Sequence, residues 1–141
     1  IILEIEYKAP GMMPELCRQL EAFPGRSDCI IFSGEPALID EIQAYARENG
    51  LPEGVKLGAN IRRLTEAWKE KIPSMKLFEV GLNIEAIERE DIDWLHAHNI
   101  LVFSNLGDTP EGWKKICTHS LTGFKTNYTA PFSAWWEAWK S

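Results

Sequence analysis

The stretch from 29 to 49, CIIFSGEPALIDEIQAYAREN, joins a strand pattern directly to a helix pattern. Its first five residues, CIIFS, form a continuous apolar run, which is typical of a strand buried on both faces of a parallel sheet. Pro36 follows at the start of the helical part, where proline is favoured. Three apolar residues then recur on one helical face: Leu38, Ile42 and Tyr45. The stretch therefore predicts one β-strand followed by one covering α-helix.

The same alternation continues on both sides of this unit. Further strand patterns lie at 2–7, 55–59, 75–82, 100–106 and 122–128. Helical spacing of apolar residues follows them at 13–23, 61–72, 87–95, 108–120 and 131–140. We expect Asn60 to cap the helix at 61–72. Six βα units in strict alternation predict a parallel sheet covered by helices, as a doubly wound sheet or a barrel.

Polar residues concentrate where the expected strands end: Glu6, Lys8, Ser33, Asn60, Asn83, Ser104, Asn105, Thr126 and Asn127. In a βα barrel these positions share the C-terminal rim, where active sites lie. The glycine-rich motifs of nucleotide-binding sheets are absent, which favours the barrel. A complete eight-unit barrel needs about 200 residues or more, and this chain has 141. We therefore expect an α/β fold, an incomplete (β/α)8 barrel of about six parallel units.

The composition restricts the partners. A net charge of −6 with scattered basic residues argues against nucleic-acid binding, although a local pocket can still attract an anion. No apolar run is long enough for a transmembrane segment. Cys17, Cys29 and Cys117 form no metal-binding spacing and are expected to be reduced packing residues. A cytoplasmic location is favoured, but targeting information upstream of Ile1 can be missing, so the compartment is left open.

Four segments carry a resemblance to a known family. LEIEYK at 3–8 ends in Glu-x-Lys, IIFSG at 30–34 ends a strand in Ser-Gly, ILVFSN at 100–105 ends in Phe-Ser-Asn, and GFKTNY at 123–128 ends in Thr-Asn-Tyr. In this order and spacing they resemble the glycerophosphodiester phosphodiesterases, metal-dependent hydrolases with a (β/α)8 barrel. The resemblance covers essentially the whole chain, so residues 1–141 are expected to be the C-terminal portion of such a domain.

The resemblance implies roles for four residues. Glu6 corresponds to a ligand of a divalent metal, Mg²⁺ or Ca²⁺, and Lys8 to a contact of the substrate phosphate. Phe103 takes the place of an aromatic residue near the glycerol moiety, and Asn105 takes the polar position after it. The implied reaction is hydrolysis of a small phosphodiester to glycerol 3-phosphate and an alcohol.

The chain also departs from the family pattern. Gly34 stands where phenylalanine is usual, Phe103 where tryptophan is usual, and Asn127 where aspartate is usual. The family's catalytic histidine, a Glu-x-Asp metal pair and a second histidine belong to strands before LEIEYK, so no catalytic residue is assigned here. We expect the fragment alone to be inactive, and its open sheet edges predict self-association or marginal stability. The alternative is a non-catalytic relative that serves as a phosphate-binding or structural module.

The residues alone leave four points open. Phe103 can border the substrate or be ordinary barrel packing. Glu6 and Lys8 are two apart and point to one face of a strand, so they can hold a cation and an anion or pair with each other at a solvated strand end. Asn127 can contact substrate or fix a turn, and the turn is favoured. Lys8 as a Schiff-base nucleophile requires a desolvated lysine, which a neighbouring glutamate disfavours. Four closing aromatic residues are expected to be core: Phe132, Trp135, Trp136 and Trp139. The alternative is an exposed patch for a membrane interface or for the rest of the domain.

Overall fold

The structure is a computed structural model that describes residues 2–105 and 107–141. In these residues six strands alternate with six α-helices. The strands are β1 (Leu3–Glu6), β2 (Cys29–Ser33), β3 (Lys56–Arg62), β4 (Glu79–Asn83), β5 (Leu101–Asn105) and β6 (Gly123–Phe124). The helices are α1 (Met13–Ala22), α2 (Pro36–Asn49), α3 (Glu66–Lys71), α4 (Arg89–Ala97), α5 (Pro110–Thr118) and α6 (Thr129–Trp139). Three short 3₁₀ turns complete the order: η1 (Arg26–Asp28), η2 (Ile72–Ser74) and η3 (Ile84–Ala86).

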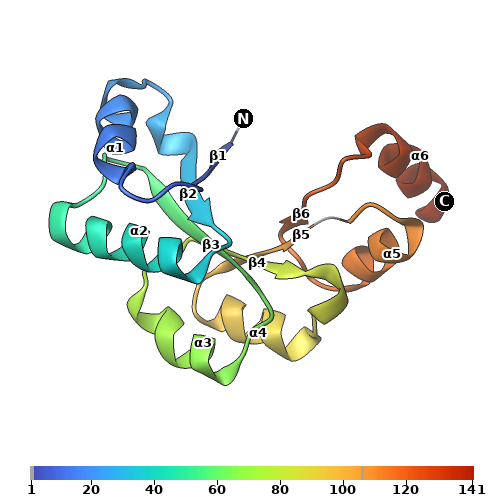
Figure 1. The fold of residues 1–141 in the computed structure, drawn as a ribbon. Helices are drawn as coiled ribbons and strands as arrows, with labels where there is room; N and C mark the ends of the chain where they lie inside the picture. The colour runs from blue at the N-terminus through green and yellow to red at the C-terminus, as the bar shows by residue number, and fades with distance from the viewer. Residues whose placement is uncertain (1, 106) are drawn as a thin grey trace.

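All six strands are parallel and lie in chain order, from β1 at one edge to β6 at the other. The sheet curls, and the helices lie along its outer side (Figure 1). Right-handed crossovers place every helix on the same side of such a sheet. The predicted incomplete (β/α)8 barrel is therefore confirmed.

The strand register divides the side chains between two faces. The outer face supplies the core under the helices, where Ile31, Val80 and Val102 are fully buried. The alternate residues of each strand point to the inner face. There Phe32 on β2 pairs with Gly58 on β3, and Gly58 pairs with Glu79 on β4. The inner face is therefore partly polar, whereas the outer face is apolar.

Several element boundaries differ from the predictions, and two of the differences have a clear cause. Asn60 does not cap a helix, because β3 continues past it to Arg62. Thr65 caps α3 instead, and its hydroxyl accepts a hydrogen bond from the Trp68 amide at 3.4 Å. The final strand pattern at 122–128 yields only Gly123–Phe124, because the chain turns away from the sheet after Lys125. The predicted strand at 100–106 matches β5, and residue 106 lies outside the described residues.

The prediction that the closing aromatic residues form core is wrong. No residue of α6 is buried, and Trp139 is exposed. The rings stack mainly on one another, as in Trp135–Trp139 and Trp136–Trp139, and Phe132 meets Phe124 edge to face at 4.8 Å. The helical spacing correctly indicated an apolar face. Trp113 on α5 and Phe124 on β6 cover this face only in part, so its residues are at most half-buried.

Candidate active site

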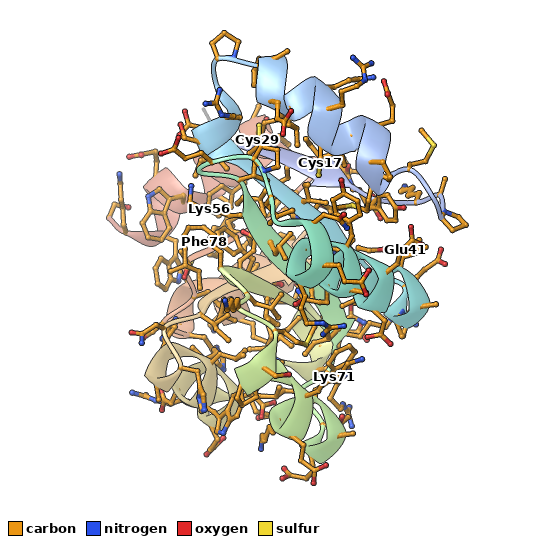
Figure 2. The ribbon with its side chains drawn as sticks, turned by 90° about the vertical axis from the view of Figure 1, so that its left-hand side faces the viewer. Cys17, Cys29, Glu41, Lys56, Lys71 and Phe78 are labelled. Atoms are coloured by element: carbon orange, nitrogen blue, oxygen red, sulfur yellow. The ribbon has the colours of Figure 1, made fainter. Side chains whose placement is uncertain are left out.

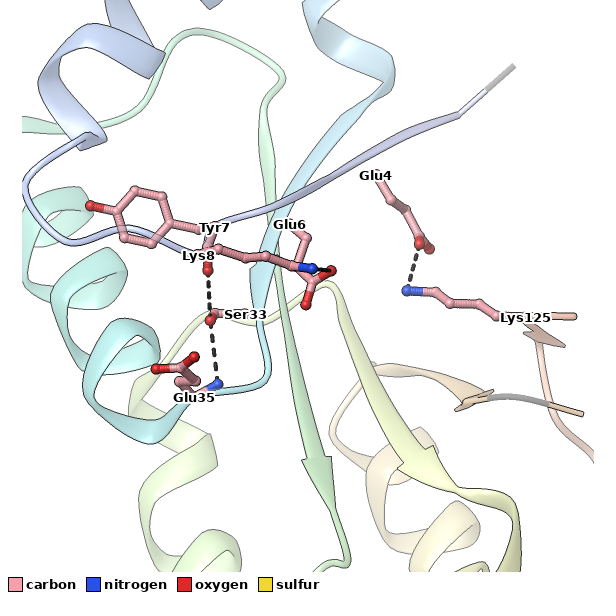
Figure 3. Close-up of polar contacts among 7 residues, drawn as sticks. All are labelled: Glu4, Glu6, Tyr7, Lys8, Ser33, Glu35 and Lys125. Carbon is pink, nitrogen blue, oxygen red and sulfur yellow. Dashed lines mark hydrogen bonds and ion pairs between the residues drawn. The ribbon is translucent and has the colours of Figure 1, made fainter. Parts of the chain in front are cut away.

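The Glu-x-Lys pair lies at the end of β1, on the C-terminal rim of the sheet. Glu6 is the last residue of the strand, and Lys8 follows Tyr7 in the loop. The Lys8 Nζ lies 3.1 Å from a Glu6 carboxylate oxygen, and the side chains are 72% and 43% exposed (Figure 3). An exposed pair of this kind is weak, because water competes for both charges. Both groups thus remain accessible to a ligand from solvent.

Buried hydrogen bonds hold the chain next to this pair. The Ser33 hydroxyl at the end of β2 donates to the Tyr7 carbonyl at 2.8 Å and accepts from the Glu35 amide at 3.3 Å (Figure 3). The Tyr7 side chain points to the opposite face, where its hydroxyl donates to Glu41 on α2. Burial and the bond to Glu41 raise the pKa of Tyr7 above its ordinary value of 10.0. These contacts fix the backbone that carries Glu6 and Lys8.

A hollow of about 380 Å³ opens beside this part of the rim. Its lining comes from the ends of β2 and β3 and from α3: Gly34, Glu35, Pro36, Asn60, Ile61, Arg62 and Trp68. Gly34 leaves the hollow open, because a Cβ there would meet nothing nearer than Asn60 at 3.8 Å. The departure from phenylalanine at this position therefore coincides with space at the rim.

Phe103 and Asn105 point to the inner face from β5 and have different surroundings. The Phe103 ring covers Gly123 on β6 so closely that a Cβ there would approach the ring to 2.8 Å. Phe103 thus packs against β6 on the inner face of the sheet. Asn105 ends the strand, half-buried, and its side-chain oxygen lies beside the side chain of Asn60 over Gly81. A Cβ at Gly81 would clash with the Asn60 side-chain oxygen, so this amide occupies its position because residue 81 is glycine.

At the end of β6 the polar residues bind one another. Asp108 accepts hydrogen bonds from the Thr126 hydroxyl at 2.9 Å, the Asn127 amide at 2.9 Å and the Asn127 side chain at 2.8 Å. The hydrogen bonds from Asn127, and then that from Thr126, lower the pKa of Asp108 below its ordinary 3.8. Asn127 therefore fixes a turn, the interpretation that its residue type favours.

A charged cluster lies between these two ends, on the inner face. The Lys125 Nζ, just after β6, lies 2.6 Å from a Glu4 carboxylate oxygen on β1 (Figure 3) and 4.0 Å from the centre of the Phe32 ring. Glu79 on β4 is only 4% exposed, and its Oε2 has no hydrogen-bond partner in the described chain. Burial and the nearby Glu4 carboxylate raise the pKa of Glu79 to about 7, although Lys125 opposes the shift.

Sequence reasoning missed this cluster and assigned no role to Glu4. Glu79 could have been found as a lone carboxylate inside the apolar strand pattern at 75–82. No comparable signal existed for the Glu4–Lys125 pair, because it depends on the curl that brings the last strand opposite the first.

The described residues do not by themselves form a metal centre. No group of three or more His, Cys, Asp or Glu side chains in 2–105 and 107–141 is placed to hold an ion. Mg²⁺ and Ca²⁺ require six or more oxygen ligands, and Glu6 is one carboxylate. The histidines lie at helix ends, where His98 stacks on Trp94 and His119 contacts the Lys115 carbonyl at 2.6 Å. None of the three stands at the rim.

Comparisons with known proteins agree with the fold. No protein-family model and no curated protein matches the chain. Among solved structures, a candidate glycerophosphodiester phosphodiesterase from Galdieria sulphuraria superposes with a TM-score of 0.80 at 14% identity, over 97% of this chain and 57% of that one. A glycerophosphoryl diester phosphodiesterase from Parabacteroides distasonis gives 0.68 at 13%, over 98% and 51%.

A third structure adds a bound product. It is a phosphodiesterase from Oleispira antarctica in complex with sn-glycerol-3-phosphate, with a TM-score of 0.74 at 14% identity, over 97% of this chain and 56% of that one. The chain spans a little over half the length of these three proteins. At such identities the likeness establishes a shared fold, and the predicted resemblance is confirmed at that level. No helix in the described residues is long and apolar enough to cross a membrane.

Proposed function

We propose that this chain is part of a metal-dependent glycerophosphodiester phosphodiesterase and that residues 1–141 alone are inactive. The parent reaction is hydrolysis of a glycerophosphodiester: water adds to phosphorus, the bond to the alcohol oxygen breaks, and glycerol 3-phosphate and an alcohol are released. One observation carries the proposal. The fold matches these phosphodiesterases over nearly its whole length, and the Glu-x-Lys motif that suggested them lies on the rim with both side chains accessible.

In this proposal Lys8 and Glu6 bind the phosphate and the cation. The Lys8 ammonium binds a phosphate oxygen as a point charge after leaving its exposed partner, Glu6. Glu6 provides one carboxylate to a divalent cation, Mg²⁺ or Ca²⁺, whose chemistry when bound is to polarise the phosphoryl group. The remaining ligands belong, in this proposal, to the part of the barrel that the related structures have and this chain does not span. Phe103 and Asn105 would border the glycerol moiety from the inner face.

A second candidate is a non-catalytic barrel that binds phosphate or has a structural role. It is favoured by the number of rim residues that already have protein partners. Glu6 pairs with Lys8, Phe103 packs on Gly123, and Asn127 is bound to Asp108. The Schiff-base alternative has no such support, because Lys8 is exposed and paired with a carboxylate.

Binding of sn-glycerol 3-phosphate to the 141-residue chain, followed by NMR titration, tests the proposed site. Lys8→Met should weaken binding about tenfold or more, since it removes the only proposed phosphate contact. Lys114→Met removes an equally exposed lysine from α5 and should leave binding unchanged. Equal effects of the two substitutions would contradict the proposed role of Lys8.

Turnover separates the enzyme from the non-catalytic module. The 141-residue chain should not hydrolyse glycerophosphocholine with Mg²⁺ or Ca²⁺ above a Glu6→Ala control, and hydrolysis above that control would refute its inactivity. The longest natural form of the protein should hydrolyse the same substrate and lose that activity in Glu6→Gln. Retained binding of glycerol 3-phosphate without turnover in that form would establish the non-catalytic module instead.

A further inference from the structure

A cavity larger than the hollow at the rim lies at the opposite end of the sheet. It has a volume of about 760 Å³ and opens between the C-terminal half of α2 and the segment that leads from η2 into β4. Its lining includes Ala46, Arg47, Leu51, Val55, Lys76 and Phe78. This volume is within the range of small-molecule pockets, roughly 300–1,000 Å³.

The inner wall of this cavity is apolar. Leu57, Met75 and Leu77 are buried side chains of the core, and Leu51 and Val55 are half-buried beside them. The half-buried side chains of Leu51, Val55 and Phe78 still expose apolar surface to water, and such surface is stabilised by about 25 cal/mol per Å² when it leaves water. An apolar group of a ligand would therefore be stabilised here.

The charges around the cavity all have one sign. Arg47, Lys56 and Lys76 line it, and no carboxylate does so in the described residues. This local excess of positive charge occurs on a chain whose net charge is −6. A concave positive region with low-dielectric walls concentrates anions whatever the sign of the whole molecule.

The three cations are not equally available to a ligand. Lys56 already donates to the Ser27 carbonyl at 2.6 Å, and its Nζ lies 5.2 Å from the centre of the Phe78 ring (Figure 2). Arg47 and Lys76 are exposed and form no ion pair in the described part of the chain. Lys76 also has φ of 49°, an uncommon left-handed conformation for a residue with a side chain. Arg47 and Lys76 are thus the groups free to bind an anion.

We propose that this cavity binds an anionic single-chain amphiphile. Its hydrocarbon chain lies against the half-buried side chains of Leu51, Val55 and Phe78, and its carboxylate or phosphate is bound by Arg47 and Lys76. A neutral apolar ligand would leave both cations without a partner, and a small hydrophilic anion would leave the apolar wall in water. Only a molecule with both parts satisfies the whole surface. The proposal is independent of the phosphodiesterase function, because the site lies at the other end of the strands.

The test compares four probes with the 141-residue chain by NMR titration, each below its micelle concentration. Octyl phosphate and octanoate carry both parts, octanol carries only the chain, and inorganic phosphate carries only the charge. The two anionic amphiphiles should each bind about tenfold or more tightly than octanol and inorganic phosphate. The tighter of the two identifies the headgroup. Equal binding of octanol, or binding of inorganic phosphate alone, would overturn the proposal.

Four substitutions locate the binding. Lys76→Glu should lower the affinity for both anionic amphiphiles about tenfold, and Lys114→Glu, with the same change of net charge on α5, should not. Ala46→Phe should prevent binding of the ligand's hydrocarbon chain by filling the cavity, and circular dichroism would confirm that the variant is folded. Lys8→Met should have no effect, which separates this site from the rim. Equal losses of affinity in Lys76→Glu and Lys114→Glu would show that binding depends only on net charge, and would refute the site.

Discussion

The ends of β1 and β6 use similar polar residues in different ways. At β6, Asp108 accepts three hydrogen bonds from Thr126 and Asn127, so its lone pairs are directed to the protein. At β1, Glu6 and Lys8 form one exposed ion pair and leave most of their bonding capacity to solvent. The comparison shows that a polar strand end is a candidate site only where its hydrogen-bonding capacity remains free.

The inner face connects the two ends. Lys125 directly precedes Thr126, Glu4 lies two residues before Glu6, and the two side chains form an ion pair across the curl of the sheet. Glu79 lies next to this pair with one oxygen unpartnered in the described chain. Substitutions at Glu79 on the inner face, at the β6 end and at the β1 end should therefore have effects of decreasing size on stability.

The largest effect is expected from Glu79→Gln. The pKa of Glu79 is raised to about 7 from 4.5, so the folded protein retains a proton that the unfolded chain releases. The free energy of unfolding should therefore fall by at most about 3 kcal/mol as the pH rises from about 4.5 to 7. Glu79→Gln should remove this slope and be the more stable form above pH 7.

Urea unfolding across this pH range measures the slope. Glu85→Gln, which removes an exposed carboxylate from η3, is the matched control and should keep the wild-type slope. If the free energy of unfolding depends on pH equally in wild type and Glu79→Gln, the Glu79 carboxylate does not change its protonation on folding. That outcome would contradict the prediction.

A smaller loss is expected at the β6 end. Asp108→Ala removes the shared acceptor of three hydrogen bonds and should lower Tm by several degrees at pH 7. Because the pKa of Asp108 is lowered, this stabilisation is present above the ordinary value of 3.8 and is lost as the pH falls through the folded-state value. Asp93→Ala, on the exposed side of α4, is the control. A Tm difference that persists in acid would contradict a role for the ionised carboxylate.

The smallest effect on stability is expected at the β1 end. Glu6→Gln and Lys8→Met each break only an exposed ion pair, so Tm should change by no more than about 2 °C. Differential scanning fluorimetry measures this, with Asp108→Ala in the same experiment. A loss in either variant as large as that in Asp108→Ala would make the β1 end structural and remove the distinction between the two regions.

The alternation of strands and helices could be predicted because each unit carries its own apolar periodicity. CIIFS became β2, and the helix expected after Pro36 became α2. The start of α3 could not be predicted, because Asn60 and Thr65 are both good capping residues. The pairing of β3 with β4 decides between them. The aromatic spacing of α6 identified an apolar face but held no information on what covers it.

The candidate site was predictable only in part. Glu6 and Lys8 were expected on one face of a strand end, and the structure brings their charges together there. Their roles towards metal and phosphate stay predictions. The Glu4–Lys125 pair and the burial of Glu79 arise from the curvature of the whole sheet, which no local pattern encodes.

The order of the strands has a consequence for how the molecule assembles. Each strand pairs with its predecessor in the chain, so a new strand always joins an edge that earlier residues have already formed. No strand must wait for a distant segment, and the loop entropy to be overcome at each step is that of a single crossover. Within the described strands, the sheet can therefore be extended one strand at a time from β1 towards β6 during synthesis, and the Glu4–Lys125 contact forms only once β6 has been added.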